Sequence, residues 1–275
     1  MLTIHASRQD TITLDNKEFF FLAGILGSDR LLGVEDPFQG YLAEEISEEW
    51  DIVKDSLLEK GYLIEEENGI ELSMPPKIFS RVAIAGLAQR SCWLKYVQND
   101  ETFEGYLHVT NERVVQVCKS AEDCQYKLDE LGTVEEACRT LVEEMDLKNF
   151  APMEAPALLL SKKKFAHLFS HTSEIPFEEL GDQLVKATND VEGSIALAKC
   201  MKYRTGEGEL QLSTWTGSGW ESQNAAFMVN DTMNWLVRMS IKGDQDWLTA
   251  IPASREQFEE MLLQWLKQPA ELNGR

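Results

Sequence analysis

The sequence predicts an α+β fold: a quasi-twofold duplicated arrangement, with a central antiparallel β-sheet flanked by helices. The main observation is an internal repeat, because residues 14–22 and 160–168 carry the same pattern. In both, a short apolar run ends at an N-cap residue, Asp15 or Ser161, whose side-chain oxygen can accept from the first turn of a helix. A second helical pattern and a series of alternating strands follow in both places.

Each repeat is also expected to close on a capped, acidic, amphipathic helix, beginning at Ser120 in the first and at Ser254 in the second. We therefore expect two α+β halves. Residues 1–150 hold a helix, a hairpin and a three-stranded meander, and residues 151–275 hold a five-stranded meander and a C-terminal helix. The two can also form one compact domain, because 275 residues suffice for a single large core.

In the first half, Asp15 and Glu18 predict a capping box. Asn68-Gly69, between two short apolar runs, predicts the turn of a β-hairpin that packs against the preceding helix. In chain order, the expected elements are a helix over 39–60, a hairpin over 62–72, a small apolar helix after Pro75-Pro76, strands over 92–97, 105–109 and 113–118, and helices over 120–145 broken near Gly132.

In the second half, glycine-rich turns separate runs with a period of two, which is typical of strands in a meander. The final helix begins at Ser254, where Gln257 completes a second capping box. The expected strands cover 194–203, 209–215, 220–229, 232–242 and 247–251, with turns at 206–208, 217–219 and 243–244.

The composition is that of a soluble globular protein with a large excess of acidic residues. The formal net charge is -21, so the chain should be repelled by nucleic acid, although the charge also serves solubility. Its five cysteines include no C-x-x-C pair, which indicates reduced thiols. No apolar run is long enough for a membrane span, and no signal peptide is visible, so we expect a cytoplasmic protein without membrane insertion.

A helix followed by a hairpin is also the outline of a winged helix. In this chain the helix that would enter the groove carries Glu44, Glu48 and Asp51, and the hairpin tip is acidic as well. Like charge would oppose phosphate, so we interpret this segment as a packing unit.

Catalytic and metal-binding motifs are weak. His167 and His171 have the i, i+4 spacing that can hold a metal on one helix, but no third ligand lies nearby in the sequence, so we interpret them as polar or partly buried helix residues. The glycines at 217–219 lie between strand patterns and predict a hairpin turn, since a phosphate site would need a helix N-terminus. We expect no catalytic residues, no cofactor and no metal.

The aromatic residues leave a binding surface open. Most tryptophans should lie in the core. Trp215 and Trp220 flank the 217–219 turn among polar residues, so they can instead be exposed anchors of a partner-binding surface, with Phe227 on the same strand. Because the second meander is expected to have more strands, we place this surface on the second half.

The order of elements resembles the EspG-like family, cytosolic chaperones of type VII (ESX) secretion in Gram-positive bacteria and their relatives. Residues 14–22, 27–34 and 247–254 carry the likeness. The resemblance implies a quasi-twofold fold and a client held through exposed sheet and loop surface. The clients would be helical secreted proteins or toxins of the WXG/LXG or PE/PPE kind.

The function expected from the resemblance is therefore that of a non-catalytic chaperone or adaptor, which holds a helical-hairpin secretion substrate or toxin in the cytosol. The strong negative charge would suit a basic client. The alternative is an immunity or regulatory protein that binds and neutralises a toxin. An enzyme with scattered active-site residues is a third reading, and the sequence does not specify the client, the oligomeric state or the source organism.

Overall fold

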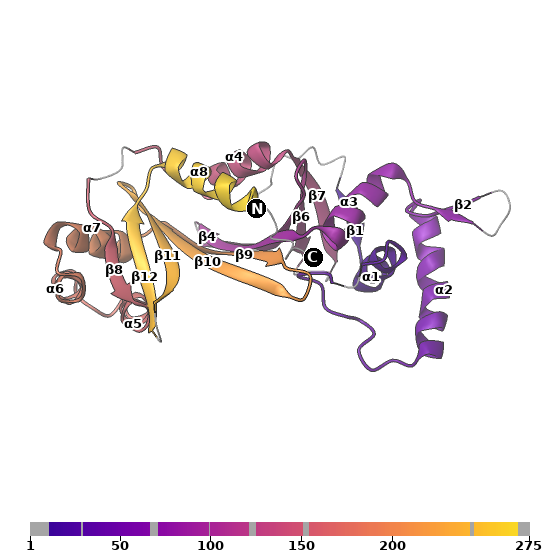
Figure 1. Ribbon diagram of the computed structural model, residues 1–275, viewed down its shortest axis with the longest axis horizontal. Helices are drawn as coiled ribbons and strands as arrows, with labels where there is room; N and C mark the ends of the chain where they lie inside the picture. Colours follow the sequence, from indigo (N-terminus) through magenta and orange to yellow (C-terminus); the bar gives the residue numbers. More distant parts are fainter. Residues whose placement is uncertain are drawn as a thin grey trace.

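The computed structural model describes residues 11–28, 30–66, 71–98, 100–120, 125–150, 154–242 and 245–268. They form one ten-stranded sheet with helices on both faces, together with a separate two-stranded hairpin (Figure 1). Every strand pair is antiparallel. The α+β prediction, with a central antiparallel sheet flanked by helices, is confirmed.

The two halves of the sheet have the same strand topology when each is read from its outer edge toward the centre. It runs β1-β7-β6-β5-β4-β9-β10-β11-β12-β8, so each half contributes a four-stranded meander and one earlier strand at the outer edge. The strands are β1 (Ile12–Leu14), β4 (Arg90–Gln98), β5 (Glu101–Val109), β6 (Val114–Lys119), β7 (Tyr126–Gly132), β8 (Leu158–Ser161), β9 (Gly206–Trp215), β10 (Trp220–Val229), β11 (Asn234–Lys242) and β12 (Gln245–Pro252).

The two halves meet where β4 pairs with β9. Arg90 opposes Val109 beside the β5–β6 turn, and Gly206 opposes Val229 beside the β10–β11 turn, so Arg90 and Gly206 hold equivalent positions. Four residues further along each strand, Leu94 and Leu210 are therefore equivalent, and they are also opposite each other. A quasi-twofold axis passes between these two leucines.

The helices divide between the two faces of the sheet. On one face, α4 (Val134–Glu144) and α8 (Arg255–Leu266) cover the centre. On the other face, helices cover only the two ends (Figure 1). These are α1 (Asn16–Ile25), α2 (Ala43–Glu59) and α3 (Pro76–Leu87) at one end, with the hairpin β2 (Ile64–Glu65) and β3 (Leu72–Ser73), and α5 (Lys162–Ser170), α6 (Phe177–Thr188) and α7 (Val191–Lys202) at the other.

Three hydrophobic clusters follow from this arrangement. The central cluster lies between the middle strands and α4 with α8, where Phe227 contacts Phe258 edge to face. A second cluster lies under α1 to α3 around Phe19 and Tyr126, and a third lies under α5 to α7 around Trp235. Burial of these apolar side chains is the main force that holds the helices on the sheet.

The predicted helix starts are confirmed where the side chains form caps. Asp15 and Glu18 form the reciprocal capping box of α1, and Ser254 and Gln257 form that of α8. Ser161 caps α5 by accepting from the Lys164 amide. The hairpin of β2 and β3 is also confirmed, although its turn, like the expected turn at 243–244, lies outside the described residues.

The prediction of helices over 120–145 is wrong in its first part. Residues 126–132 form β7, in which Tyr126 and Leu128 are buried and Lys127 is exposed, which is the period of a strand. The helix begins only after Gly132, which has a φ of 83°. Its N-cap is Thr133, and Ser120 instead donates its amide to the carbonyl of residue 125.

The prediction of a strand over 194–203 is also wrong. These residues belong to α7, in which Asp190 accepts from the Gly193 amide at 2.7 Å and the buried residues include Leu197 and Met201, one helical turn apart. Each half therefore has a meander of four strands, not three and five. The second half does not have more strands than the first, so the number of strands gives no reason to place the partner-binding surface on the second half.

Candidate functional site

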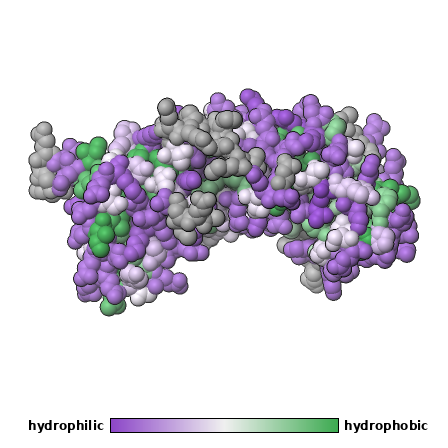
Figure 2. All heavy atoms as spheres, turned by 180° about the vertical axis from the view of Figure 1, so that it is seen from behind, coloured by the Kyte–Doolittle hydropathy of each residue, from purple (hydrophilic) through white to green (hydrophobic). Residues whose placement is uncertain are grey.

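The centre of the sheet is uncovered on the face opposite α4 and α8. In β4 the buried residues Leu94 and Tyr96 point to the central cluster, so Trp93, Lys95 and Val97 point the other way. This surface lies between the α1–α3 end and the α5–α7 end. Figure 2 shows the hollow between these two lobes from behind. We call this uncovered strip of β4, β5, β9 and β10 the open face.

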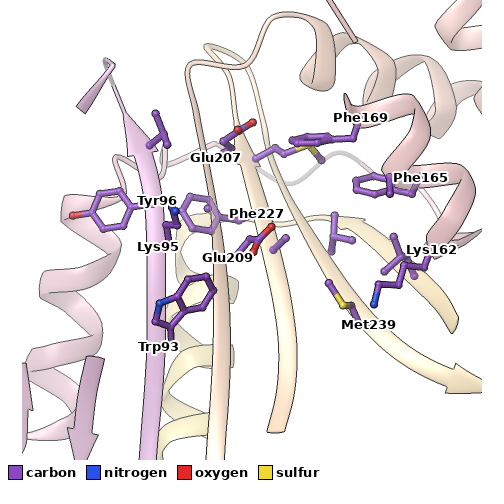
Figure 3. Close-up of a pocket in the computed structure, with 17 residues that line it drawn as sticks. Trp93, Lys95, Tyr96, Lys162, Phe165, Phe169, Glu207, Glu209, Phe227 and Met239 are labelled. Atoms are coloured by element: carbon purple, nitrogen blue, oxygen red, sulfur yellow. The ribbon is translucent and has the colours of Figure 1, made fainter. Parts of the chain in front are cut away.

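A pocket of about 470 Å³ lies where the open face meets α5. Its floor comes from β9, β10 and β11, one wall comes from β4, and the opposite wall comes from α5 (Figure 3). The residues that line it are Trp93, Lys95, Tyr96, Val97, Lys162, Phe165, Ala166, Phe169, Glu207, Gly208, Glu209, Ala226, Phe227, Met228, Val237, Met239 and Leu248.

The pocket is apolar at its base and charged at its rim. Phe165 and Phe169 stack with ring centroids 5.7 Å apart on α5, and they face Trp93 across the cavity. Met239 is 39% exposed, although large apolar side chains are usually covered. A concave apolar surface with a few charged groups around it is typical of a binding site.

The charged rim continues across the sheet as a row of alternating sign. Glu104, Lys95 and Glu209 are neighbours on β5, β4 and β9, and the Lys95 Nζ lies 3.2 Å from a Glu104 carboxylate oxygen. The Trp93 indole donates to the same carboxylate at 3.2 Å. The rim therefore offers both signs of charge to a partner, while the pocket beside it offers apolar contact.

The three residues predicted to bind a partner lie in two different places. Trp215 and Trp220 are opposite each other at the end of the β9–β10 hairpin, with centroids 5.5 Å apart, and both are partly exposed. The Arg30 guanidinium lies 4.6 Å from the Trp215 ring centroid. Phe227 is only 2% exposed and packs on Phe258, so it is a core residue beneath the pocket and not an exposed anchor.

Histidine and cysteine side chains in the described part of the chain are the other candidates for chemistry. His167 and His171 lie with ring centroids 4.6 Å apart, and no group of three metal-binding side chains occurs among the residues described. Burial raises the pKa of the Cys92 and Cys200 thiols to about 12, which keeps them protonated and poor nucleophiles. Burial lowers the pKa of His108 to about 4.

Sequence reasoning missed the α5 wall of the site. Phe165 and Phe169 are spaced i, i+4, but Leu168 between them is the buried residue of this helix. The available signal was an aromatic pair next to the buried face of the helix, since such a pair either packs on a neighbouring surface or stays partly exposed. Lys95 and Glu209 gave no signal, because only the β4–β9 pairing brings them together.

Within the described residues, no helix is both long and apolar enough to cross a membrane. The fold and the open face define the chain as a two-lobed α+β protein with a duplicated sheet and one uncovered central surface. Neither the protein-family models nor the curated protein sequences contain a match to this sequence.

Solved structures do show the fold. The chain is similar to the Mycobacterium tuberculosis type VII secretion system chaperone EspG5, whose structure was solved in complex with a PE25–PPE41 dimer. The TM-score is 0.63 at 10% sequence identity, and the match covers 93% of this chain and 95% of that chain. The quasi-twofold architecture of the described chain is therefore an arrangement found in a secretion chaperone.

Proposed function

We propose that this protein is a non-catalytic chaperone or adaptor of the EspG-like kind, which holds a helical-hairpin secretion substrate or toxin in the cytosol. The observation that carries the proposal is the open face with its apolar pocket between the two helical lobes. A sheet that leaves Trp93, Phe165 and Met239 available for apolar contact has a surface ready for a protein partner.

The likeness to EspG5 supports the kind of partner. That chaperone was captured with a PE25–PPE41 dimer, and the likeness covers almost the whole of both chains. For this chain we propose a partner of the WXG/LXG or PE/PPE kind, bound at the open face. The tip of a helical hairpin would lie in the hollow between the lobes, and apolar side chains from that tip would enter the pocket at its side.

The charge of the chain supports a basic client. With a formal net charge of -21, the protein should attract a positively charged partner over long range and accelerate association. The test is to measure the affinity and the association rate of the client at low salt and at high salt. A steep fall with salt supports a basic client, and a flat response contradicts it.

The experiment that tests the function is recovery of the partner from the native cytosol with a tagged chain. A double variant, Trp93→Ala with Phe165→Ala, removes apolar contact from both walls of the pocket. The matched control is Phe79→Ala on α3, an aromatic residue that is 50% exposed and does not line the pocket. We expect a helical partner with the wild type and with the control, and none with the double variant.

Recovery of the chain without any helical partner would refute the proposal, and equal recovery with the double variant would move the site away from the open face. The immunity alternative is tested in the same experiment. If the recovered partner is a toxin whose activity the chain blocks, the protein neutralises it; if the toxin stays active, the protein carries it.

A further inference from the structure

The strands β10 and β11 are paired along only half of β10. Their pairing runs from Val229 opposite Asn234 to Ala225 opposite Arg238, and then stops. Beyond that point β10 continues to Trp220 paired only with β9, and β11 continues to Lys242 paired only with β12. Figure 1 shows the two strand pairs diverging. We call the space between them the fork.

Backbone groups of β10 point into the fork. Because Trp215 donates its amide to the carbonyl of Gln89 on the β4 side, the alternate residue Thr214 points its backbone groups toward β10. Thr214 opposes Glu221, so Glu221 points back toward β9, and Trp220, Ser222 and Asn224 point away from it. No strand in the described part of the chain pairs with these three residues on that side.

The fork opens directly into the binding pocket. A second pocket of about 350 Å³ lies along it and shares Lys162 and Met239 with the first. It is lined by Lys162, Ser222, Gln223, Asn224, Arg238, Met239, Asp246 and Trp265. An unpaired strand edge beside an apolar pocket is the arrangement by which sheets bind extended peptides, since the backbone provides affinity and alternate side chains provide specificity.

The equivalent position in the first half is covered by the chain itself. There β5 and β6 also part, after Tyr106 opposite Val117. The segment between α1 and α2 crosses this place: Gly33 lies so close to the Tyr106 ring that a Cβ would overlap it, and Glu35 lies 4.0 Å from Lys119. A turn of the chain, with Gly33 at a φ of 81°, therefore already lies on one of the two quasi-equivalent sites.

One side chain also differs between the two sites. By the equivalence of the β5–β6 and β10–β11 turns, Tyr106 corresponds to Ala226, and Ala226 lies on the floor of the pocket. The aromatic ring that fills the first site is absent from the second. The open site thus lies where two strands part in a similar way, one residue pair later than in the first half, and it has no aromatic ring in the place of Tyr106.

The charges at the fork favour a segment that carries a carboxylate. Arg238 is exposed, points to the α8 side, and has its guanidinium 6.0 Å from the Trp265 ring centroid. Among the described residues no carboxylate forms an ion pair with it. A segment in the fork would place every second side chain on the same face as Arg238.

We propose that the fork accepts an extended segment of the partner, which adds a strand to the edge of β10, sends apolar side chains into the pocket and places one carboxylate near Arg238. The inference rests on the proposed function, since it names the part of the client that this site would hold. The occupant is a polypeptide strand with alternating apolar and polar side chains.

The test uses a defined probe, a capped seven-residue peptide that alternates valine with threonine and carries one central aspartate. Amide exchange of the full chain is followed by nuclear magnetic resonance at millimolar peptide. We expect saturable slowing of exchange, by about tenfold for a bond worth about 1.4 kcal/mol, at Ser222 and Asn224. Glu221 and Gln223, whose amides already face β9, should change little. A peptide with prolines at every threonine should have no effect, because proline cannot donate.

Two pairs of comparisons test the geometry in the protein. Ser222→Pro and Ser222→Ala both lose the hydroxyl that lies 2.9 Å from the Ser213 hydroxyl, but only proline lacks the amide that faces the fork. We expect binding to be lost in the first and kept in the second. Ala226→Tyr, which copies Tyr106, should abolish binding by filling the pocket, and exchanging the aspartate of the peptide for lysine should weaken it.

The inference is overturned if millimolar peptide leaves the Ser222 and Asn224 amides unprotected, or if Ser222→Pro binds as Ser222→Ala does. These outcomes leave the proposed function standing, because recovery of a helical partner at the open face does not depend on strand addition. Conversely, if the chain binds the peptide but no helical partner is recovered with it, strand addition at the fork is supported and the proposed function is refuted.

Discussion

Leu94 and Leu210 face each other across the central strand pair and hold equivalent positions in the two halves of the chain. Both are fully buried beneath α4 and α8. The quasi-twofold axis between them means that each half presents its innermost strand to the other as a sheet edge. The same axis relates the open pocket to its covered counterpart, and it makes the two halves dependent on each other.

We expect that neither half folds alone, although residues 1–150 and 151–275 each carry a complete set of elements. Separation would expose the nine paired positions of β4 and β9 and the apolar residues beneath them. Each half should be soluble only when the two are co-expressed, as seen by size-exclusion chromatography and circular dichroism. Two independently folded fragments with sharp thermal transitions would show instead that the halves are separate domains.

Replacement of Arg90 by methionine should destabilise the protein by roughly 2 to 4 kcal/mol. The Arg90 guanidinium is buried, donates to the main-chain carbonyl of Leu266 at the end of α8, and donates to the Asn111 side chain at 2.6 Å. Methionine keeps the apolar stem but leaves these acceptors without a donor. Urea unfolding of the variant and the wild type measures the difference.

Arg255→Met is the matched control for Arg90. Its guanidinium lies 3.1 Å from a Glu143 carboxylate oxygen, and the side chain of Glu143 is 59% exposed. A surface pair of this kind contributes about 1 kcal/mol or less. If Arg255→Met lowers the free energy of unfolding as much as Arg90→Met does, the burial of the Arg90 hydrogen bonds is not the cause of the destabilisation.

Glu144→Gln should stabilise the protein at pH 8 and have no effect near pH 4.5. Burial, with Glu143 beside it, raises the pKa of Glu144 to about 7. Between pH 4.5 and 7 the folded state therefore holds a proton that the unfolded state has lost, so stability falls as pH rises through this window. The variant removes that loss, about 1 to 2 kcal/mol after allowance for partial exposure.

Glu144 is also the last residue of α4, where a negative charge interacts unfavourably with the helix dipole. Above pH 7, Glu144→Gln therefore stabilises the folded state in two ways, since it removes both a buried charge and this unfavourable interaction. Melting temperatures of both proteins across pH 4.5 to 8 provide the measurement. Parallel curves for the two proteins would mean that Glu144 titrates normally.

Gly208→Ala should cost about 2 kcal/mol or more. A Cβ at this position of β9 would lie 2.6 Å from the Phe227 Cζ and 2.7 Å from the Tyr96 Cβ, and the latter atom cannot move without its strand. Gly219→Ala is the control, because nothing lies within 4 Å of a Cβ there. Chemical denaturation of both variants tests the claim, and equal stability would show that β9 shifts to make room.

Local sequence determined the elements whose signals are short-range. Asp15 with Glu18 and Ser254 with Gln257 predicted two helix starts, because a cap is formed by residues three apart. The alternation in residues 232–242 predicted β11 for the same reason. The two errors concern segments whose sequences fit either class. In residues 126–132, Leu128 and Leu131 are spaced i, i+3 as on a helix, although Tyr126 and Leu128 alternate as on a strand, and residues 194–203 are mostly apolar and fit a buried strand as well as a helix.

The sequence by itself determined that the chain is acidic, duplicated, α+β and without a recognisable catalytic motif, since these are properties of composition and of neighbours along the chain. Only the tertiary structure decided where a partner can bind. The pocket brings together Trp93, Phe165 and Met239 from β4, α5 and β11, and the fork exists only because β10 and β11 stop pairing at Ala225. Long-range pairing of strands, which no local pattern encodes, created both.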